Sequence, residues 1–175
     1  MTNTIPAIAG GEIAKKTPYG STVRYGDEEI AELAEAVHQQ TLFYASGKKV
    51  RQLEAEFAGK YGAKHAIATS SGTASVHAAL IAAGVSPGDE VIVSPITDMG
   101  TIAPILYQGA VPIFADLTPT GHVLDPTDVA RRITERTKAV IAVHLWGNAC
   151  DLDALQALCE PRGITLVEDC AQAFG

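Results

Sequence analysis

Five short apolar runs alternate with amphipathic helical segments along this chain, and that alternation restricts the fold more than any other feature. Strands that alternate with helices form parallel sheets, because each crossover returns the chain to the same edge. Residues 138–144 are apolar almost throughout, as in strands that are covered on both faces. We therefore predict an α/β fold with a doubly wound, mainly parallel sheet. The expected strands are residues 65–69, 90–94, 111–115, 138–144 and 164–167.

The predicted helices have recognisable ends. Residues 27–40 and 48–61 carry apolar side chains at helical spacing, and Gly62 is placed to end the second helix. Asp125 before Pro126 is typical of a helix start. Pro104 is tolerated only in a first turn, so we expect it there in the helix that ends at Gly109. Other helices are expected over residues 73–84, 125–133 and 151–163.

Composition argues against several classes of protein. The net charge is −7 and no run of Lys or Arg exceeds two residues, which argues against a nucleic-acid-binding surface. Uncharged runs are too short to span a membrane, and the N-terminus lacks the pattern of a secretory signal. Cys150, Cys159 and Cys170 are an odd number without C-x-x-C spacing. We expect them to be small buried thiols in a reducing cytoplasm, and we expect no metal site.

Residues 64–84 contain the strongest signal for a ligand. A short apolar run ends at Thr69, the small residues Ser70, Ser71 and Gly72 follow, and a helical pattern begins at Thr73. A helix that starts directly after a strand presents backbone N–H groups and a positive dipole end to an anion. The alternative, an ordinary strand–helix turn with a Thr cap, fits these residues equally well.

Ligands of doubly wound sheets bind beyond the carboxyl ends of the strands. An anion-binding turn at one strand and a carboxylate at the last strand suit a ligand with a phosphate at one end and a cationic nitrogen at the other. Pyridoxal phosphate (PLP) has both groups. A nicotinamide cofactor is not expected, because no G-x-G-x-x-G follows any strand. The side chains expected at this edge are Ser71 to Thr73, Thr97, Asp98, Asp116, His144 to Gly147, Asp169 and Gln172.

Several segments resemble the DegT/StrS-type sugar aminotransferases, which are fold-type I PLP enzymes. They appear in family order and spacing and cover the chain from Gly47 onward. The resemblance implies an arm and first helix over residues 1–46 and part of the PLP-binding large domain over residues 47–175. The segments are GKKVRQLEAEFAGKYG (47–62), SGTASVHAAL (71–80), GVSPGDEVIVSP (84–95), GAVPIFADL (109–117), ITERTKAVIAVHLWG (133–147) and VEDCAQAFG (167–175).

The resemblance also implies roles for particular residues. Gly72, Thr73 and Ala74 match the turn that holds the cofactor phosphate. Asp169 matches the acid that pairs with the pyridine nitrogen, and an opposite charge nearby keeps that nitrogen protonated. Gln172 matches the residue beside the 3′-hydroxyl of the ring.

The lysine that forms the Schiff base is expected beyond Gly175, so no catalytic residue is expected within the chain. Lys60, Lys64 and Lys138 do not match the position of that lysine.

Two further residues are candidate substrate or ring contacts. Asp98 follows Thr97 where the family usually has an aromatic residue that stacks on the ring. We favour a capping role for Asp98 at the start of the next helix, with a substrate contact as the alternative. His144 ends an apolar strand, where a structural role is the more common one.

The resemblance implies transfer of an amino group from glutamate or glutamine to a keto-sugar, with a nucleotide-linked sugar favoured, or to a keto-cyclitol. It also implies a cytoplasmic homodimer whose active sites are built from both subunits, without membrane or nucleic-acid partners. Two alternatives remain open: a dehydratase-type member that has replaced the lysine, and an inactive fragment.

Overall fold

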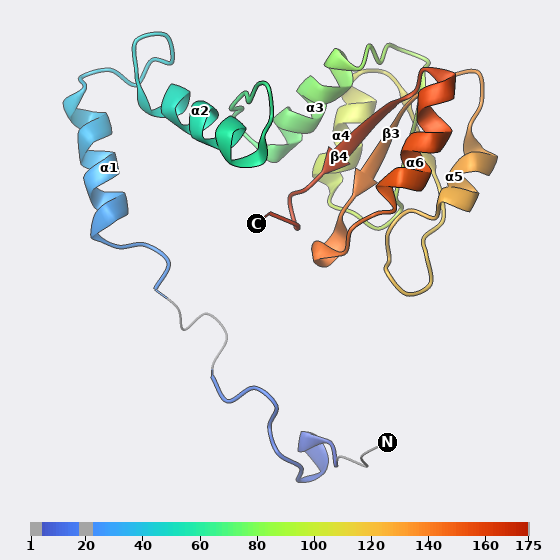
Figure 1. Cartoon of the computed structure of the whole chain (residues 1–175), viewed down its shortest axis with the longest axis horizontal. Helices are drawn as coiled ribbons and strands as arrows, with labels where there is room; N and C mark the ends of the chain where they lie inside the picture. Colours follow the sequence, from blue (N-terminus) through green and yellow to red (C-terminus); the bar gives the residue numbers. More distant parts are fainter. Residues whose placement is uncertain (1–4, 18–22, 175) are drawn as a thin grey trace. The chain divides into compact units, whose positions relative to one another are not determined.

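The computed structural model describes residues 5–17 and 23–174. By its internal contacts the chain divides into two compact units, Met1–Ala66 and Ile67–Gly175. Figure 1 shows the helices of the first unit and the sheet with its helices in the second. The predicted division after residue 46 stays a prediction. Part of the predicted N-terminal arm, residues 1–4 and 18–22, lies outside the described residues.

The first unit contains two helices joined by ion pairs. A short 3-10 turn, η1 (Ala7–Ala9), precedes α1 (Asp27–His38) and α2 (Lys49–Tyr61). Lys49 Nζ donates to Glu32 Oε2 at 2.5 Å and to Glu35 Oε2 at 2.7 Å, which ties the start of α2 to α1. As predicted, Gly62 ends α2 with a left-handed conformation (φ 64°), which glycine adopts without strain.

The second unit is a parallel sheet of four strands in the order β2-β1-β3-β4. Its elements are α3 (Gly72–Ala82), β1 (Glu90–Val93), α4 (Met99–Tyr107), β2 (Val111–Phe114), α5 (Pro126–Arg132), β3 (Thr137–Val143), η2 (Leu145–Gly147), α6 (Leu152–Cys159), η3 (Glu160–Arg162) and β4 (Thr165–Asp169).

Alternate residues of the central strands enter two separate cores. Ile92 of β1 and Val140 of β3 pack with Leu155 of α6 on one face of the sheet, together with α5. Their neighbours Val91 and Ile141 pack on the other face, against α3 and α4. The helices therefore cover both faces, as Figure 1 shows, and the predicted doubly wound α/β fold is confirmed.

The predicted strand over residues 65–69 is wrong. These residues have no strand assignment, and Ile67 is 81% exposed. An apolar run becomes a strand only when a neighbouring strand satisfies its backbone hydrogen bonds, and no described strand pairs with this segment. The other four predicted strands are present within one or two residues of the expected bounds.

The expectation for Pro104 is also wrong. Pro104 lies inside α4, beyond the first turn, and its side chain is buried. A proline at this position removes the backbone hydrogen bond to the carbonyl of Gly100. The complete burial of the Pro104 side chain offsets this loss.

No helix in the described parts of the chain combines the length and the apolar character that a membrane crossing requires.

Candidate functional site

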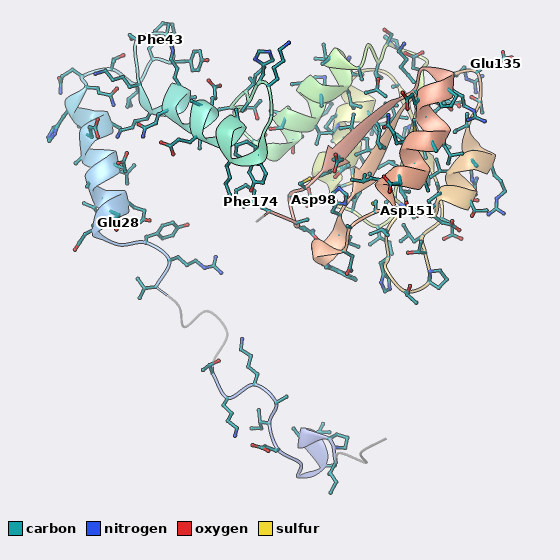
Figure 2. All side chains as sticks on the ribbon, in the orientation of Figure 1. Glu28, Phe43, Asp98, Glu135, Asp151 and Phe174 are labelled. Atoms are coloured by element: carbon teal, nitrogen blue, oxygen red, sulfur yellow. The ribbon has the colours of Figure 1, made fainter. Side chains whose placement is uncertain are left out.

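The candidate residues lie at the carboxyl edge of the sheet in the second unit. Because the sheet is parallel, the loops after all four strands and the N-terminus of α3 meet at this edge. Figure 2 labels Asp98 and Asp151 at this edge, and Glu135 at the opposite edge, where β3 is about to begin.

The turn before α3 is held together by hydroxyl groups. Ser71 is the N-cap, and its Oγ accepts from the backbone N–H of Ala74 at 3.1 Å. Thr69 Oγ1 donates to the carbonyl of Ser71 at 2.9 Å. The helix begins at Gly72, and its first amides face away from the helix body, where they have no intrahelical acceptor. Gly72 and Thr73 therefore lie where an anion can bind, with the half-buried Thr73 hydroxyl beside them.

Asp169 is the last residue of β4, and both of its carboxylate oxygens accept hydrogen bonds. Thr101 Oγ1 donates to Oδ2 at 2.7 Å, and the backbone N–H of Ala171 donates to Oδ1 at 3.1 Å. The Thr101 side chain belongs to α4 and is 2% exposed, whereas Asp169 is half-buried. The carboxylate is therefore fixed in orientation and still accessible from one side.

Asp98 caps α4, as predicted. Its Oδ1 accepts from the backbone N–H of Gly100 at 2.7 Å. Gly100 in turn lies against the α3 turn: a Cβ at this position would be 2.8 Å from Thr73 Oγ1 and 2.9 Å from Asp98 Oδ1. The first turn of α4 thus contacts two parts of the site. Gly100 lies against the candidate phosphate turn, and the next residue, Thr101, donates to Asp169.

Gln172 is exposed and holds the loop after β3. Its Oε1 accepts from the backbone N–H of Trp146 at 2.8 Å. Since a backbone N–H only donates, this bond orients the amide so that Nε2 remains a donor on the other side. Trp146 has a left-handed backbone (φ 54°), which is unusual for a large residue.

His144 is buried at the end of β3 and has both ring nitrogens engaged. Nδ1 accepts from the backbone N–H of Cys150 at 3.1 Å, so the proton of the neutral ring lies on Nε2, which is 3.0 Å from Glu168 Oε2. His144, Glu168 and Cys170 place their potential metal ligands within 4.8 Å of one another. An Nε2 that carries the proton has no free lone pair for a metal, so this cluster is a hydrogen-bonded pair rather than a metal site.

The cysteines differ from the expectation at one position. Cys150 and Cys159 are buried free thiols, as expected, but Cys170 is exposed. Partial desolvation, and then the negative charges of Glu168 and Asp169, raise the pKa of the Cys170 thiol. The expectation treated the three thiols alike because composition and spacing do not indicate which cysteine side chain turns outward.

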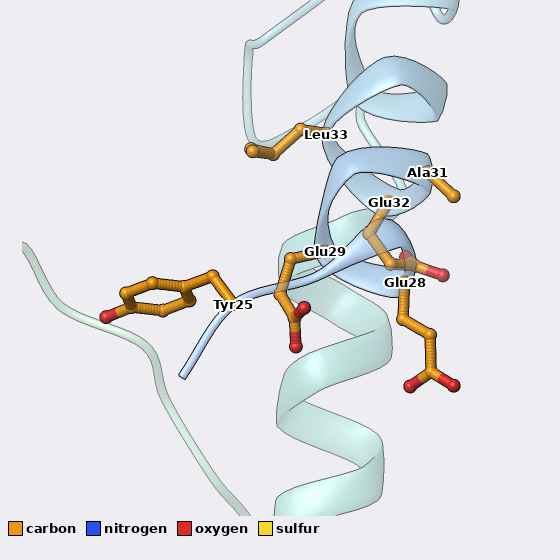
Figure 3. A pocket seen from close by; sticks show the side chains of 6 residues that line it. All are labelled: Tyr25, Glu28, Glu29, Ala31, Glu32 and Leu33. Atoms are coloured by element: carbon orange, nitrogen blue, oxygen red, sulfur yellow. The ribbon is translucent and has the colours of Figure 1, made fainter. Parts of the chain in front are cut away.

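A hollow elsewhere in the chain contains none of these candidates. It lies along α1 in the first unit and is lined by Tyr25, Glu28, Glu29, Ala31, Glu32 and Leu33 (Figure 3). Its three acidic side chains are already used within the first unit: Glu28 and Glu29 belong to the first turn of α1, and Glu32 pairs with Lys49. It therefore offers no convergent set of groups for the predicted phosphate ligand.

Sequence reasoning missed Gly100 and Thr101 as parts of the site. Thr97 and Thr101 are four residues apart, a spacing that places both hydroxyls on one side of a helical turn. In the structure their Oγ1 atoms are 2.9 Å apart. That spacing was the available signal, but nothing local indicates that Thr101 reaches a residue 68 positions away.

Comparison with known proteins gives a consistent result. The model of the DegT/DnrJ/EryC1/StrS aminotransferase family matches residues 24–175. The chain is 45% identical over 148 residues to the spore coat polysaccharide biosynthesis protein SpsC of Bacillus subtilis (strain 168), covering 85% of the chain and 38% of SpsC. It is 43% identical over 129 residues to the GDP-perosamine synthase of Vibrio cholerae, covering 74% of the chain and 35% of the synthase.

A solved structure agrees with these matches. The X-ray structure of the aminotransferase from Psychrobacter cryohalolentis superimposes with a TM-score of 0.83 at 34% identity, over 91% of the chain and 40% of that protein. The chain thus spans about two fifths of the length of the proteins that it matches.

Replacement of Asp98 tests its capping role. We expect Asp98→Ala to lower the free energy of unfolding by about 1 kcal/mol, because the Gly100 amide loses its acceptor, and Asp98→Asn to retain most of that stability. Urea denaturation followed by circular dichroism measures both. Equal losses in the two variants would contradict the cap.

Alkylation tests the three cysteine environments. With iodoacetamide near neutral pH, we expect mass spectrometry to find the native chain modified at Cys170 alone, and at Cys150 and Cys159 only after unfolding. Because the pKa of Cys170 is raised, its rate should keep increasing above the pH at which an ordinary thiol levels off. Glu168→Gln removes one of the two charges and should shift this rise to lower pH, whereas the distant Glu135→Gln should not.

Proposed function

Because the chain belongs to the DegT/DnrJ/EryC1/StrS aminotransferase family, we propose that it forms the cofactor-binding part of a PLP-dependent sugar aminotransferase. One observation carries the proposal. A helix N-terminus and an oriented carboxylate lie at one sheet edge, and the first turn of α4 contacts both.

The residues present fit PLP. The amides of the α3 turn and the Thr73 hydroxyl would hold the phosphate, and Asp169 would pair with the protonated ring nitrogen. Gln172, whose Nε2 remains a donor, would lie beside the ring hydroxyl. The Ala74 amide already donates to Ser71 Oγ, so a phosphate would have to share this bond. When bound, PLP supplies an electron sink for removal of a proton next to the amine nitrogen.

In this proposal Asp169 and the α3 turn bind and orient the cofactor. The lysine that moves the proton belongs to the segment expected after Gly175, and Lys60, Lys64 and Lys138 have no part in it. His144 holds the ends of β3 and β4 together, because its backbone N–H also donates to the carbonyl of Asp169 at 3.1 Å. We therefore assign His144 a structural role rather than a direct contact with the ring.

The proposed substrate is a keto-sugar, with a nucleotide-linked sugar favoured and a keto-cyclitol as the second class. The names of two relatives, a spore coat polysaccharide biosynthesis protein and a GDP-perosamine synthase, support a sugar. Glutamate or glutamine would supply the amino group. We propose a cytoplasmic location for this reaction.

We further propose that the protein is a homodimer whose sites use residues of both subunits. In the first unit, several apolar side chains along α1 and α2 are exposed, including Leu33 at 68% and Leu53 at 56%. A dimer interface would cover such side chains. Sedimentation velocity at micromolar concentration should give a dimer, and a monomer at every concentration would contradict this proposal.

The charge of Asp169 is the sharpest test of the proposed function. In the protein complete with its lysine, we expect Asp169→Asn to retain part of the bound PLP while amino transfer from glutamate to a nucleotide-linked keto-sugar falls at least about a hundredfold. The interaction with the ring nitrogen is used chiefly in the transition state, so its loss lowers kcat more than cofactor binding.

Asp116→Asn is the matched control, because Asp116 follows β2 at the same edge and its carboxylate accepts, within the described part of the chain, from the neighbouring amide of Leu117. Near-normal turnover in Asp169→Asn, or an equal loss in Asp116→Asn, would contradict the role of Asp169.

A further inference from the structure

We propose that the first turn of α4 is the positioning element of the cofactor site: Thr101 orients Asp169, and Gly100 leaves room for the phosphate-binding rotamer of Thr73. This inference rests on the proposed function. It assigns positioning roles to two residues that do not themselves touch the cofactor.

The hydrogen bonds of Thr101 have a defined direction. A hydroxyl has one proton, and Thr101 donates it to Asp169 Oδ2 at 2.7 Å. The contact of 2.9 Å between Thr97 Oγ1 and Thr101 Oγ1 must therefore be a donation from Thr97 to Thr101. The two hydroxyls form a short chain that points toward the carboxylate.

This chain and the Ala171 amide together restrict rotation of the Asp169 side chain. One donor binds each oxygen, at 2.7 Å and 3.1 Å, so rotation of the carboxylate would break two bonds. Each oxygen keeps a free lone pair, and the half-buried carboxylate can still accept from a further donor in this fixed orientation. An ion pair with a planar ring nitrogen depends on that direction as well as on the charge.

Gly100 acts at the other end of the cofactor. A Cβ at position 100 would lie 2.8 Å from Thr73 Oγ1 and 2.9 Å from Asp98 Oδ1, closer than such atoms approach, so an alanine would displace both groups. Displacement of Asp98 disturbs the cap of α4, whereas rotation of the Thr73 hydroxyl moves a proposed phosphate ligand. Glycine at position 100 therefore preserves both the cap and the position of this ligand.

Two probes separate the roles. One is PLP, and the other is its analogue in which a C–H replaces the ring nitrogen; both carry the phosphate. Thr101 acts on the ring nitrogen through Asp169. We therefore expect Thr101→Val to weaken PLP binding about tenfold, which is the range of one hydrogen bond to a charged group. Binding of the analogue, which has no ring nitrogen, should weaken less than about twofold. Thr101→Ser restores the hydroxyl and should restore PLP affinity. Equilibrium dialysis with the purified chain measures these constants.

The matched control for Thr101 is Thr165→Val. Thr165 is an exposed threonine at the opposite end of β4, so its replacement should change the affinity for neither probe.

For Gly100→Ala we expect the binding of both probes to weaken by the same factor, because both bind through the phosphate. Because the added methyl would also meet Asp98 Oδ1, the Gly100→Ala comparison is made in an Asp98→Ala background. When Thr73→Ala is added to that background, the methyl meets neither group, so Gly100→Ala should have no further effect. Gly59→Ala in α2, where a Cβ meets no atom within 4 Å, is the control for a glycine in a helix.

Equal weakening of both probes by Thr101→Val, or no weakening of PLP, would overturn the role of Thr101. In the Asp98→Ala background, additive losses from Thr73→Ala and Gly100→Ala would overturn the role of Gly100. A chain that binds neither probe contradicts the proposed function. In that case hydrogen exchange measured by NMR still tests whether Thr101 orients Asp169. Without ligand, Thr101→Val should speed hydrogen exchange of the Ala171 amide, and unchanged exchange would mean that Thr101 does not orient Asp169.

Discussion

The hydrogen bond from Thr101 to Asp169 is the interaction on which the candidate site depends. It connects α4, which follows β1, to the end of β4, although β3 lies between these two strands in the sheet. The bond therefore forms only when β1, β3 and β4 are paired and α4 is packed on the sheet. Thr101 is fully enclosed there, next to Ile105 of the same helix in the core. Packing of an apolar helix face thus determines where a carboxylate points, and the site inherits the rigidity of the core.

Most elements of the fold were predictable from the sequence because their signals are local. Asp125, Pro126 and Asp151 mark helix starts by their own side-chain chemistry, and the structure confirms Asp125 and Asp151 as caps. The parallel arrangement followed from the alternation of strands and helices. Asp98 belongs to the same class, since its cap reaches an amide only two residues away.

The predictions that failed, and the residues that were missed, depend on partners far away in the sequence. Residues 65–69 have the composition of a strand, but a strand also needs a neighbour, and pairing cannot be read from one apolar run. Pro104 was expected in a first turn because local rules penalise it elsewhere, whereas tertiary burial decided its place. Gly100 and Thr101 become meaningful only when α4 is placed against Thr73 and Asp169. The sequence thus predicted which groups could bind a ligand, but not what orients them.

The N-caps of α3, α4, α5 and α6 give a reason for the direction in which a phosphate-bearing ligand would lie. All four N-termini meet at the carboxyl edge, and each offers a positive dipole end to an anion. The caps of α4, α5 and α6 are the carboxylates of Asp98, Asp125 and Asp151, which already satisfy that dipole and repel a second anion. The cap of α3 is the neutral hydroxyl of Ser71. A dianionic phosphate would therefore be favoured at α3 over the other three, and in the proposed function Asp169 would pair with the cationic end of the ligand.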